Sequence, residues 1–353
     1  MKYGVSFLPD VGPGDLSGAD YYRRVLALSE DADRRGLEYV KMTEHYLHPY
    51  GGYCPSPLAF LSAVAARTSR IRLMTGCVLP VFHHPVQLAS EAAQLDAISG
   101  GRAEVGFARA YLPYEFDCFG VELTGSRDRF DEAVATVIEL WEGTSVTRRS
   151  EFFDVVDATV LPRPTAERGI PSLIAAVRTP ESFRRIGENG HGLLVTPGGL
   201  EAPAELVRRY REAFVARRPA VPEPRVVVSL PLLVSDRDED VDAADAALER
   251  YLRVWTDAVS AWDRRSSADY PSYTGMARYL EMMSGTQLRL SGSAVVGTPD
   301  EVLAQIVETD ERFGGLDAIL WQLDYGDLPE PLARRSLELF AENVRPRLPE
   351  HLR

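Results

Sequence analysis

The chain has 353 residues, which is enough to bury a large core as one big domain or as two ordinary ones. Its net charge of −13 argues against nucleic acid and anionic membrane surfaces as partners. An acidic surface still allows an anionic ligand, because a few arginines in one pocket are enough to bind it. The three cysteines, Cys54, Cys77 and Cys118, form no C-x-x-C pair, which argues against a disulfide framework or a structural zinc site.

The N-terminal sequence MKYGVSFLPD reaches a proline and an aspartate too early for a signal peptide. No apolar run approaches the roughly 20 residues that are needed to span a bilayer. Together with the cysteine pattern, which fits a reducing compartment, these features predict a cytoplasmic protein.

Short runs rich in β-branched and aromatic residues alternate along the chain with stretches whose apolar residues recur at helical spacing. The predicted strands are Lys2–Leu8, Leu37–Thr43, Ile71–Val78, Arg102–Ala108, Ser172–Val177, Gly192–Thr196, Arg225–Val234 and Leu316–Gln322. The predicted helices are Tyr21–Arg35, Pro57–Arg67, Gln87–Ile98, Asp128–Trp141, Pro180–Asn189, Ala202–Arg217, Asp238–Trp255, Pro299–Phe313 and Pro331–Val344. Ser150–Val160 has the pattern of a hairpin, and Ala258–Ser291 is too mixed to assign.

Eight strands, nearly all followed by helices and with no break in composition, predict a closed (β/α)8 TIM barrel that forms a single domain over residues 1–353. The alternative is an open doubly wound sheet, which usually carries G-x-G-x-x-G after its first strand. Here Phe7-Leu8 is followed by Pro-Asp-Val-Gly-Pro-Gly-Asp, which does not match. In either fold, ligands bind beyond the carboxyl ends of the strands, so the residues that follow the strands are the first candidates for a site.

Arginines and hydroxyl residues follow two of these strands. Arg109 lies just past the fourth strand, and Arg127 precedes a helix. Thr179 and Ser182 open another helix after the fifth strand. A helix N-terminus presents free N–H groups and a partial positive charge, so this set predicts a phosphate site. The alternative is that the arginines pair with surface carboxylates and that the hydroxyls only cap a helix.

Glu44 and His45 follow the second strand, where a histidine could transfer a proton near neutral pH. The alternative is a histidine that simply packs in its loop. His45 and His48 have H-x-x-H spacing, which makes a metal conceivable. However, the sequence does not match H-E-x-x-H, and no carboxylate cluster accompanies it, so no metal is expected. We interpret His83-His84, which precede Pro85, as a loop anchor.

At these residues the sequence resembles the bacterial luciferase-like family of flavin-dependent monooxygenases. The resemblance covers nearly the whole chain, and its most specific part is SGGRAEVGFARAYLPYEFDCFG at Ser99–Gly120. The other matching blocks are TEHY at Thr43–Tyr46, TGCVLPVFHHP at Thr75–Pro85, SR at Ser126-Arg127, TPESF at Thr179–Phe183, NGHGLLV at Asn189–Val195 and VGTPDEV at Val296–Val302.

The resemblance implies a TIM barrel that binds reduced FMN, FMNH2, at the carboxyl ends of its strands. A separate flavin reductase would supply the FMNH2, and O2 would add to it to give a peroxyflavin that oxygenates a small organic substrate. His45 matches the catalytic histidine of the family, and Gly76-Cys77 lies where many members have a non-prolyl cis peptide beside the flavin. The residues that the resemblance places at the cofactor are Glu44, Gly76, Cys77, Arg109, Tyr111, Arg127, Ala176, Val177, Arg178, Thr179 and Ser182.

Two departures narrow the expected activity. Ala108 stands where light-emitting luciferases have a reactive cysteine, and Tyr46 replaces the second histidine of their pair. Light emission is therefore not implied. Two alternatives stay open: an oxidoreductase that uses the deazaflavin F420 and transfers hydride without oxygen, and a non-catalytic flavin-binding protein.

The resemblance also implies a homodimer, formed through the predicted helices Pro57–Arg67 and Gln87–Ile98. Both helices carry alanines that would permit close approach of a second helix. Finally, Ala258–Ser291 is longer than a βα connection requires and is rich in Tyr, Trp and Met, so we predict that it covers the substrate. The alternative is an ordinary packed helix around Met276–Met283.

Overall fold

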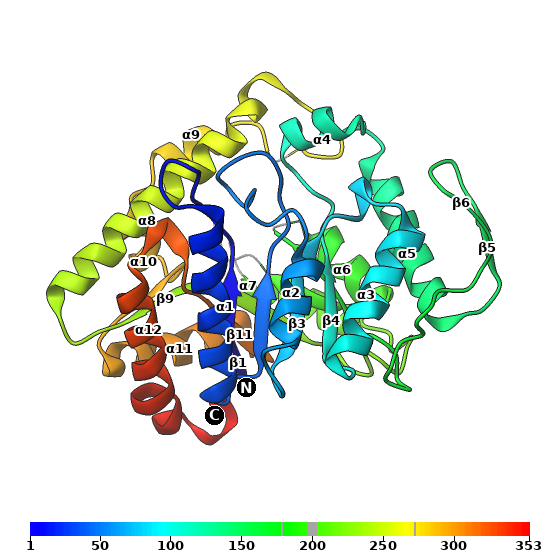
Figure 1. The fold of residues 1–353 in the computed structure, drawn as a ribbon. Coiled ribbons are helices and arrows are strands. Elements are labelled where there is room, and N and C mark those ends of the chain that lie inside the picture. The colour runs from blue at the N-terminus through cyan, green and yellow to red at the C-terminus, as the bar shows by residue number, and fades with distance from the viewer. Residues whose placement is uncertain (178, 196–202, 272) are drawn as a thin grey trace.

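The computed structural model describes residues 1–177, 179–195, 203–271 and 273–353. Eight parallel strands form a closed barrel surrounded by helices (Figure 1). These strands are β1 (Lys2–Phe7), β2 (Tyr39–Met42), β3 (Arg72–Val78), β4 (Ala103–Phe107), β7 (Ser172–Ala176), β8 (Gly192–Val195), β9 (Val226–Val234) and β11 (Ala318–Gln322). The barrel closes because β11 pairs with both β1 and β9, and β9 pairs with β8. The predicted (β/α)8 barrel is confirmed, and the open sheet is excluded.

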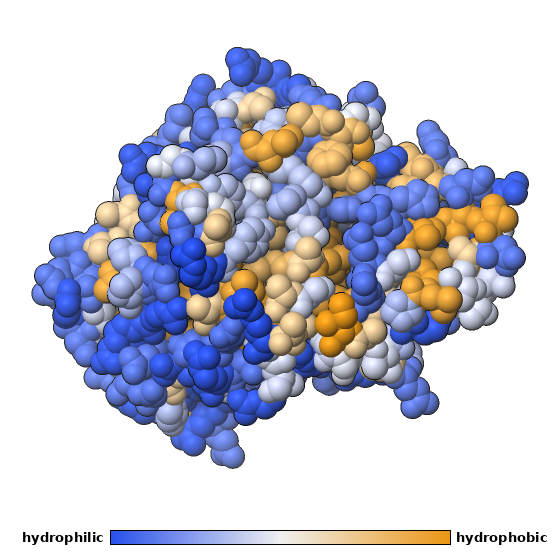
Figure 2. Space-filling model, in the orientation of Figure 1, coloured by the Kyte–Doolittle hydropathy of each residue, from blue (hydrophilic) through white to orange (hydrophobic). Residues whose placement is uncertain are grey.

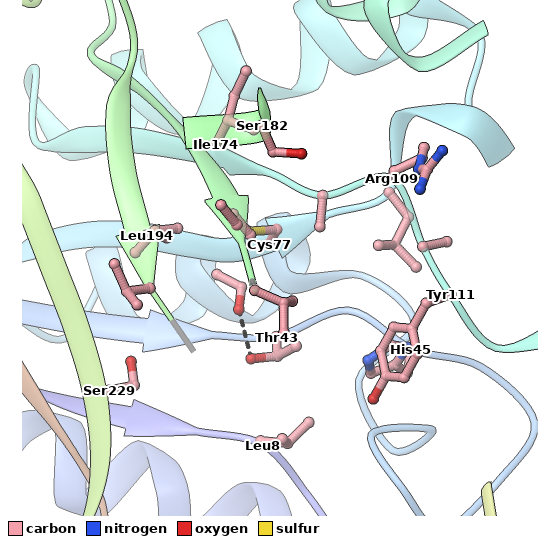
Figure 3. A pocket seen from close by; sticks show the side chains of 18 of the residues that line it. Leu8, Thr43, His45, Cys77, Arg109, Tyr111, Ile174, Ser182, Leu194 and Ser229 are labelled. Atoms are coloured by element: carbon pink, nitrogen blue, oxygen red, sulfur yellow. Dashed lines mark hydrogen bonds between the residues drawn. The ribbon is translucent and has the colours of Figure 1, made fainter. Parts of the chain in front are cut away.

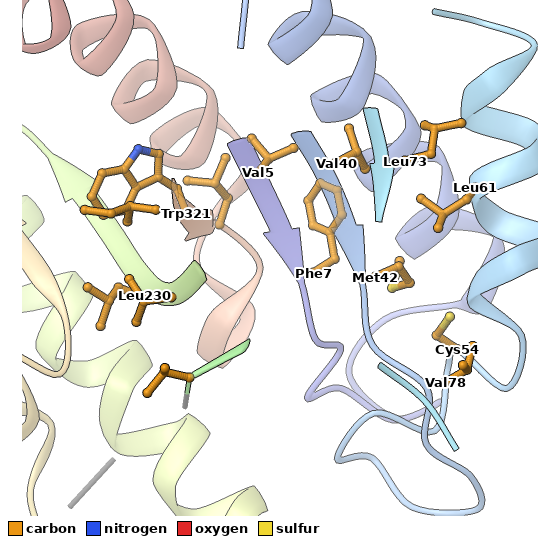
Figure 4. Close-up of a cluster of buried hydrophobic side chains, with 14 of the residues drawn as sticks. Val5, Phe7, Val40, Met42, Cys54, Leu61, Leu73, Val78, Leu230 and Trp321 are labelled. Carbon is orange, nitrogen blue, oxygen red and sulfur yellow. The ribbon is translucent and has the colours of Figure 1, made fainter. Parts of the chain in front are cut away.

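The core has two layers because successive side chains of a strand point to opposite faces of the sheet. Val5, Phe7, Val40 and Met42 belong to the outer layer between the strands and the helices (Figure 4). A smaller cluster fills the inside of the barrel, and it comprises Tyr39, Met74, Cys77, Leu173, Leu194, Val227, Ala318 and Leu320. Burial on both faces explains why these strands appear in the sequence as nearly continuous apolar runs.

The predicted helices are present, most with bounds shifted by a few residues. They are α1 (Gly18–Arg34), α2 (Pro57–Ala65), α3 (Pro85–Ser99), α5 (Ser126–Glu142), α6 (Pro180–Glu188), α7 (Pro203–Ala213), α8 (Asp238–Val259), α11 (Pro299–Phe313) and α12 (Glu330–Leu339). Capping explains several of the starts: Ser17, Ser56 and Thr298 each accept a hydrogen bond from the first turn of their helix. Thr196 and Ala202, which bounded two predicted elements, lie outside the described residues.

Several short elements were not predicted. They are α4 (Pro113–Phe119), α10 (Gly285–Leu290) and β10 (Val295–Gly297), which pairs with β9. The short helix α9 (Met276–Glu281) falls within the helix that the sequence offered as an alternative around Met276–Met283. The predicted hairpin is present as β5 (Val146–Arg149) and β6 (Asp154–Ala158), so it begins before Ser150. Elements of three to seven residues are too short to show a helical or strand period, which is why the sequence did not reveal them.

The face of the molecule shown in Figure 2 is mostly polar, in keeping with the net charge of −13. Apolar atoms gather over α4 and over the β5–β6 hairpin (Figure 2). Phe119 on α4 and Val156 on β6 are among the exposed apolar side chains. Within the described ranges, no helix is both long enough and apolar enough to cross a bilayer.

Candidate active site

A cavity of about 450 Å³ opens at the carboxyl ends of the barrel strands, and this size is within the usual range for a small-molecule site. The described residues that the sequence placed at a site all line this cavity: Glu44, His45, Gly76, Cys77, Arg109, Tyr111, Arg127, Ala176, Val177, Thr179 and Ser182. Arg178 lies outside the described residues. Sequence reasoning missed other lining residues, among them Lys41, Tyr50, Arg185, Trp255 and Asp269.

His45 is buried at one side of the cavity, beside Tyr111 (Figure 3). Its Nδ1 lies 3.0 Å from Oε1 of Glu115, a fully buried carboxylate on α4 that also accepts the backbone N–H of Tyr46 at 2.9 Å. With a carboxylate as its neighbour, Nδ1 is the nitrogen that carries the proton. The other ring nitrogen, Nε2, therefore remains available for proton exchange with a ligand. Glu115 lies in the Ser99–Gly120 block, but its sequence position gave no sign of this partnership.

Glu44 uses its carboxylate to fix the loop after β2. Oε1 accepts hydrogen bonds from the hydroxyl of Tyr46 and from Nε2 of His83, each at 2.7 Å, and Oε2 accepts the N–H of Leu79 at 3.2 Å. Burial alone would lower the pKa of His83, but the hydrogen bond to Glu44 and its charge raise that pKa above the ordinary value. Through Glu44, His83 is joined to the loop that carries His45. This contact is what a loop anchor requires.

The peptide bond between Gly76 and Cys77 is cis, as the resemblance led us to expect. The carbonyl of Gly76 accepts two hydrogen bonds, from the Thr43 hydroxyl at 2.7 Å and from Nζ of Lys41 at 3.1 Å. Burial raises the pKa of the Cys77 thiol to about 12, so this cysteine stays protonated and is no nucleophile at neutral pH.

Basic side chains line another part of the cavity. Arg109, Arg127 and Arg185 line it together with Thr179 and Ser182, beside the N-terminus of α6. Burial, and then the charge of Arg109, hold the pKa of Arg127 below its ordinary value. In Figure 3, Arg109 and Ser182 lie across the cavity from Leu8 and Ser229. Nη1 of Arg109 is buried and has no hydrogen-bond partner among the described residues, as expected of a donor that serves a ligand.

A carboxylate of this chain also reaches the basic end. Oδ2 of Asp269 accepts the backbone N–H groups of Gly125 and Arg127, at 3.0 and 3.4 Å, and lies 3.9 Å from Nη1 of Arg109. Nη2 of Arg109 donates to the carbonyl of Asp269 at 2.7 Å, and its guanidinium lies 4.0 Å from the ring centre of Tyr270. The alternative that an arginine pairs with a carboxylate is therefore partly realised, but inside the cavity and not on the surface.

Aromatic side chains form the wall beside His45. Trp255 on α8 donates to the hydroxyl of Tyr111 at 3.1 Å, and this hydroxyl donates to that of Tyr50 at 3.2 Å. The wall consists of Tyr50, Tyr111, Tyr251, Trp255 and Tyr273. Part of the cavity is thus lined by apolar rings joined by hydrogen bonds.

The segment from Ala258 to Ser291 lies against the cavity, because Asp269, Tyr270, Tyr273 and Met276 line it. Trp262 is fully buried and donates to the carbonyl of Tyr111 at 2.8 Å, whereas Met282 is 70% exposed. The position agrees with the predicted covering role. The alternative, a packed helix near Met276–Met283, is also partly realised in α9.

The spacing of His45 and His48 does not bring the two side chains to one metal site. Nε2 of His48 lies 3.0 Å from Oδ2 of Asp257, and Nδ1 accepts the N–H of Tyr50 at 3.0 Å, whereas His45 pairs with Glu115. In the part of the chain that the structure describes, no three His, Cys, Asp or Glu residues converge as metal ligands.

Comparison with known proteins places this architecture in a family. A family model described as luciferase-like monooxygenase matches residues 1–315. The chain belongs to the luciferase-like monooxygenase family. Its relatives include the 4-hydroxyprotoasukamycin monooxygenase of Streptomyces nodosus subsp. asukaensis, which is 29% identical over 355 residues, 97% of this chain and 91% of that protein.

Relatives that are named for the cofactor F420 have a similar sequence identity to this chain. The F420-dependent glucose-6-phosphate dehydrogenase of Amycolatopsis mediterranei (strain U-32) is 29% identical over 326 residues, 90% of this chain and 92% of that protein. Among solved structures, the monooxygenase RslO1 from Streptomyces bottropensis is 37% identical with a TM-score of 0.84, covering 98% of this chain and 99% of that one. The family thus contains both monooxygenases and F420-dependent dehydrogenases, all of them oxidoreductases.

Proposed function

We propose that this luciferase-like protein is the oxygenase of a two-component system that works in the cytoplasm. It would take FMNH2 from a separate flavin reductase and insert one oxygen atom from O2 into an organic substrate. The observation that carries the proposal is that one cavity combines a buried His45–Glu115 pair with an arginine-rich end. An F420-dependent hydride transfer is the second candidate, because a relative of equal identity performs that chemistry.

The arginine-rich end fits the phosphate of FMN. Arg109 and Arg127 would supply charge-assisted hydrogen bonds, and Thr179 and Ser182 would add donors at the start of α6. Nη1 of Arg109 supports this assignment: it has no hydrogen-bond acceptor among the described residues, with Oδ2 of Asp269 at 3.9 Å, and a buried guanidinium N–H without an acceptor is costly. Gly76 and Cys77 would lie along the ring, and Ala176 and Val177 would continue this surface towards α6.

When bound, reduced FMN would supply the electrons with which O2 is activated. The protein positions the ring and moves protons around it. Glu115 fixes the orientation of the His45 ring through Nδ1, so Nε2 is the ring atom that would exchange a proton with a ligand in the cavity that His45 lines. An imidazole held in this way can accept a proton and return it at that atom during turnover.

The aromatic wall would exclude water from the reacting atoms and bind an apolar substrate. Tyr50, Tyr111 and Trp255 hold one another through ring contacts and hydrogen bonds. Tyr270 and Tyr273 extend this surface from the covering segment. A dry cavity strengthens the electrostatic interactions within it and suppresses side reactions with water.

An anaerobic titration tests the choice of cofactor. The protein is titrated separately with FMNH2 and with reduced F420, and O2 is then admitted to each complex. We expect tight binding of FMNH2, followed by flavin oxidation that depends on the protein and yields product in substrate trials. Selective binding of reduced F420, with no response to O2, would establish the second candidate.

The same experiment addresses a non-catalytic flavin-binding protein. In that case FMNH2 would bind, but its reoxidation by O2 would follow the rate of the free flavin. A changed reoxidation rate, abolished in His45→Ala, would exclude this third possibility.

We also propose that the protein is a homodimer that associates through α2. Ala59, Ala63 and Ala66 on or just after this helix are exposed, so they are available to a second copy. Ala89, Ala92 and Ala93 on α3 are fully buried within the chain, so they pack on the protomer itself. Light scattering at micromolar concentration should give twice 39.1 kDa, and a mass of 39.1 kDa would contradict the dimer.

A further inference from the structure

Lys41 is a buried cation inside the barrel. It alternates with Val40 and Met42, which point outwards against the helices, so its side chain points inwards (Figure 4). The residue is 7% exposed and lines the cavity together with Ser6, Ser229 and Gln322. A charged residue in the middle of a buried strand is unusual and requires a partner or a function.

The contacts of Lys41 do not neutralise its charge. Nζ lies 3.1 Å from the carbonyl of Gly76 and 3.4 Å from the hydroxyl of Thr43, and both are neutral. Within the described residues, no carboxylate forms an ion pair with it. An ammonium group has three donors, so at least one remains for a ligand.

Two half-buried arginines of the barrel, unlike Lys41, are paired with a carboxylate. Arg225 lies 3.0 Å from Oε2 of the buried Glu104, and Arg72 binds the other oxygen of that carboxylate. Asp324 is the carboxylate whose charge reaches Lys41, but it accepts hydrogen bonds from Tyr21 and the Leu8 N–H. Burial lowers the pKa of Lys41 to about 8, and the charges of Cys77 and Asp324 oppose this shift only in part.

The position of Lys41 relative to Gly76 is fixed. A Cβ atom on Gly76 would lie 2.2 Å from Cδ of Lys41, so the lysine stem packs directly on the glycine. The ammonium therefore stays beside the peptide that, in the proposed function, lies along the flavin ring. Arg109 is the phosphate-binding residue of that proposal, so the two cations serve different parts of one ligand.

We propose that Lys41 binds the anionic edge of the reduced flavin ring and makes the site selective for the reduced cofactor. This inference rests on the proposed function. The reduced isoalloxazine carries a negative charge spread over its pyrimidine edge near neutral pH, whereas the oxidised ring is neutral. A nearby cation in a low-dielectric site favours the charged form, while the phosphate contacts are the same for both forms. The lysine would thus favour uptake of FMNH2 and release of FMN.

The test compares the affinities of the parent and of Lys41→Met for FMNH2 and oxidised FMN, both measured without substrate. Methionine keeps much of the stem and removes the charge. We expect FMNH2 binding to weaken about tenfold or more, with an effect on oxidised FMN of less than about threefold. A tenfold change in this ratio corresponds to a midpoint potential lowered by about 30 mV for a two-electron couple. Thr43→Val is the matched control, because it removes a hydrogen bond to Gly76 but no charge, and it should leave the ratio unchanged.

A structural role for the lysine would give another result. Removing a buried charge without a counterion should leave the apo protein as stable as the parent or more stable, so the melting temperature should not fall. A lower melting temperature with equal losses for both flavin forms would overturn the proposal, as would an unchanged ratio. If the parent binds neither FMN nor FMNH2, the proposed function itself fails; if the parent binds both and the ratio does not respond, only the role of Lys41 fails.

Discussion

The loop after β2 and the segment from Ala258 to Ser291 both line the cavity, but they are held in different ways. Two buried carboxylates hold the loop through several hydrogen bonds each: Glu44 within it binds Tyr46, His83 and Leu79, and Glu115 on α4 binds His45 and Tyr46. Such a network fixes a catalytic ring before any ligand arrives. In the segment, polar anchors such as Asp269 are attached to the groups that we assign to the phosphate.

Because they are held differently, the two regions should respond differently to a ligand. A ligand needs no displacement of the His45 network, because His45 already lines the cavity while its Nδ1 is held by Glu115. A phosphate at the basic end, by contrast, must share or replace the contacts of Asp269. The loop is therefore suited to chemistry and the segment to covering the site, and the predictions below test this division.

The largest expected effect is on product formation, when His45 in the loop after β2 is replaced. His45→Ala should keep FMNH2 affinity within a few fold of the parent but lower product formation by roughly 10²- to 10⁴-fold, with peroxide released instead. Binding is measured by anaerobic titration, and product and peroxide are measured after O2 is added. Loss of activity with a chelator and its recovery with zinc or iron would contradict this role, because it would assign the function of His45 to a metal.

The next effect is expected at the basic end. Arg109→Ala should weaken FMNH2 binding by about ten- to a hundredfold, since each charge-assisted contact contributes roughly 1.5–3 kcal/mol. The structure adds that Arg109 also holds Asp269 and Tyr270, so this variant should also loosen the covering segment.

Arg127→Ala separates the two effects of Arg109. The contact of Arg127 with Asp269 is made by its backbone N–H, which the substitution retains. The Arg127→Ala variant should therefore weaken flavin binding and leave the covering segment in place. Unchanged flavin affinity in both variants would rule out the phosphate assignment.

The sequence predicted the barrel well because parallel strands buried on both faces are apolar runs that alternate with amphipathic helices. It also placed His45 and Arg109 correctly at strand ends, although their roles stay predictions. It missed Glu115 because a partner 70 residues away is brought to His45 only by the fold. Lys41 could have been noticed, since a lysine inside the apolar β2 is a signal in itself.

A smaller effect is expected from proteolysis of the covering segment. Arg264 and Arg265 are exposed, and Arg265 is held on the surface by Asp117 at 2.6 Å. If the segment opens in the free protein, trypsin should cut there, and FMNH2 with substrate should slow the cleavage several fold. Equal cleavage rates with and without ligands would remove the distinction between a fixed loop and a movable cover.

The smallest and most specific effect is expected at Asp269. Its carboxylate accepts the Gly125 and Arg127 N–H groups and adds a negative charge close to Arg109, so it competes with an incoming phosphate. Asp269→Ala should therefore tighten oxidised FMN and FMNH2 binding equally, by roughly two- to fivefold, because a partly exposed charge interaction contributes about 0.2–1 kcal/mol. The same variant should speed tryptic cleavage at Arg265, since an anchor of the segment is lost. Asp263→Ala is the matched control: it removes an exposed carboxylate of the same segment that makes no hydrogen bond or ion pair within the described structure, and it should change neither quantity. Weaker flavin binding in Asp269→Ala would mean that this carboxylate organises the basic end for the ligand, and the covering segment would then be part of the fixed site.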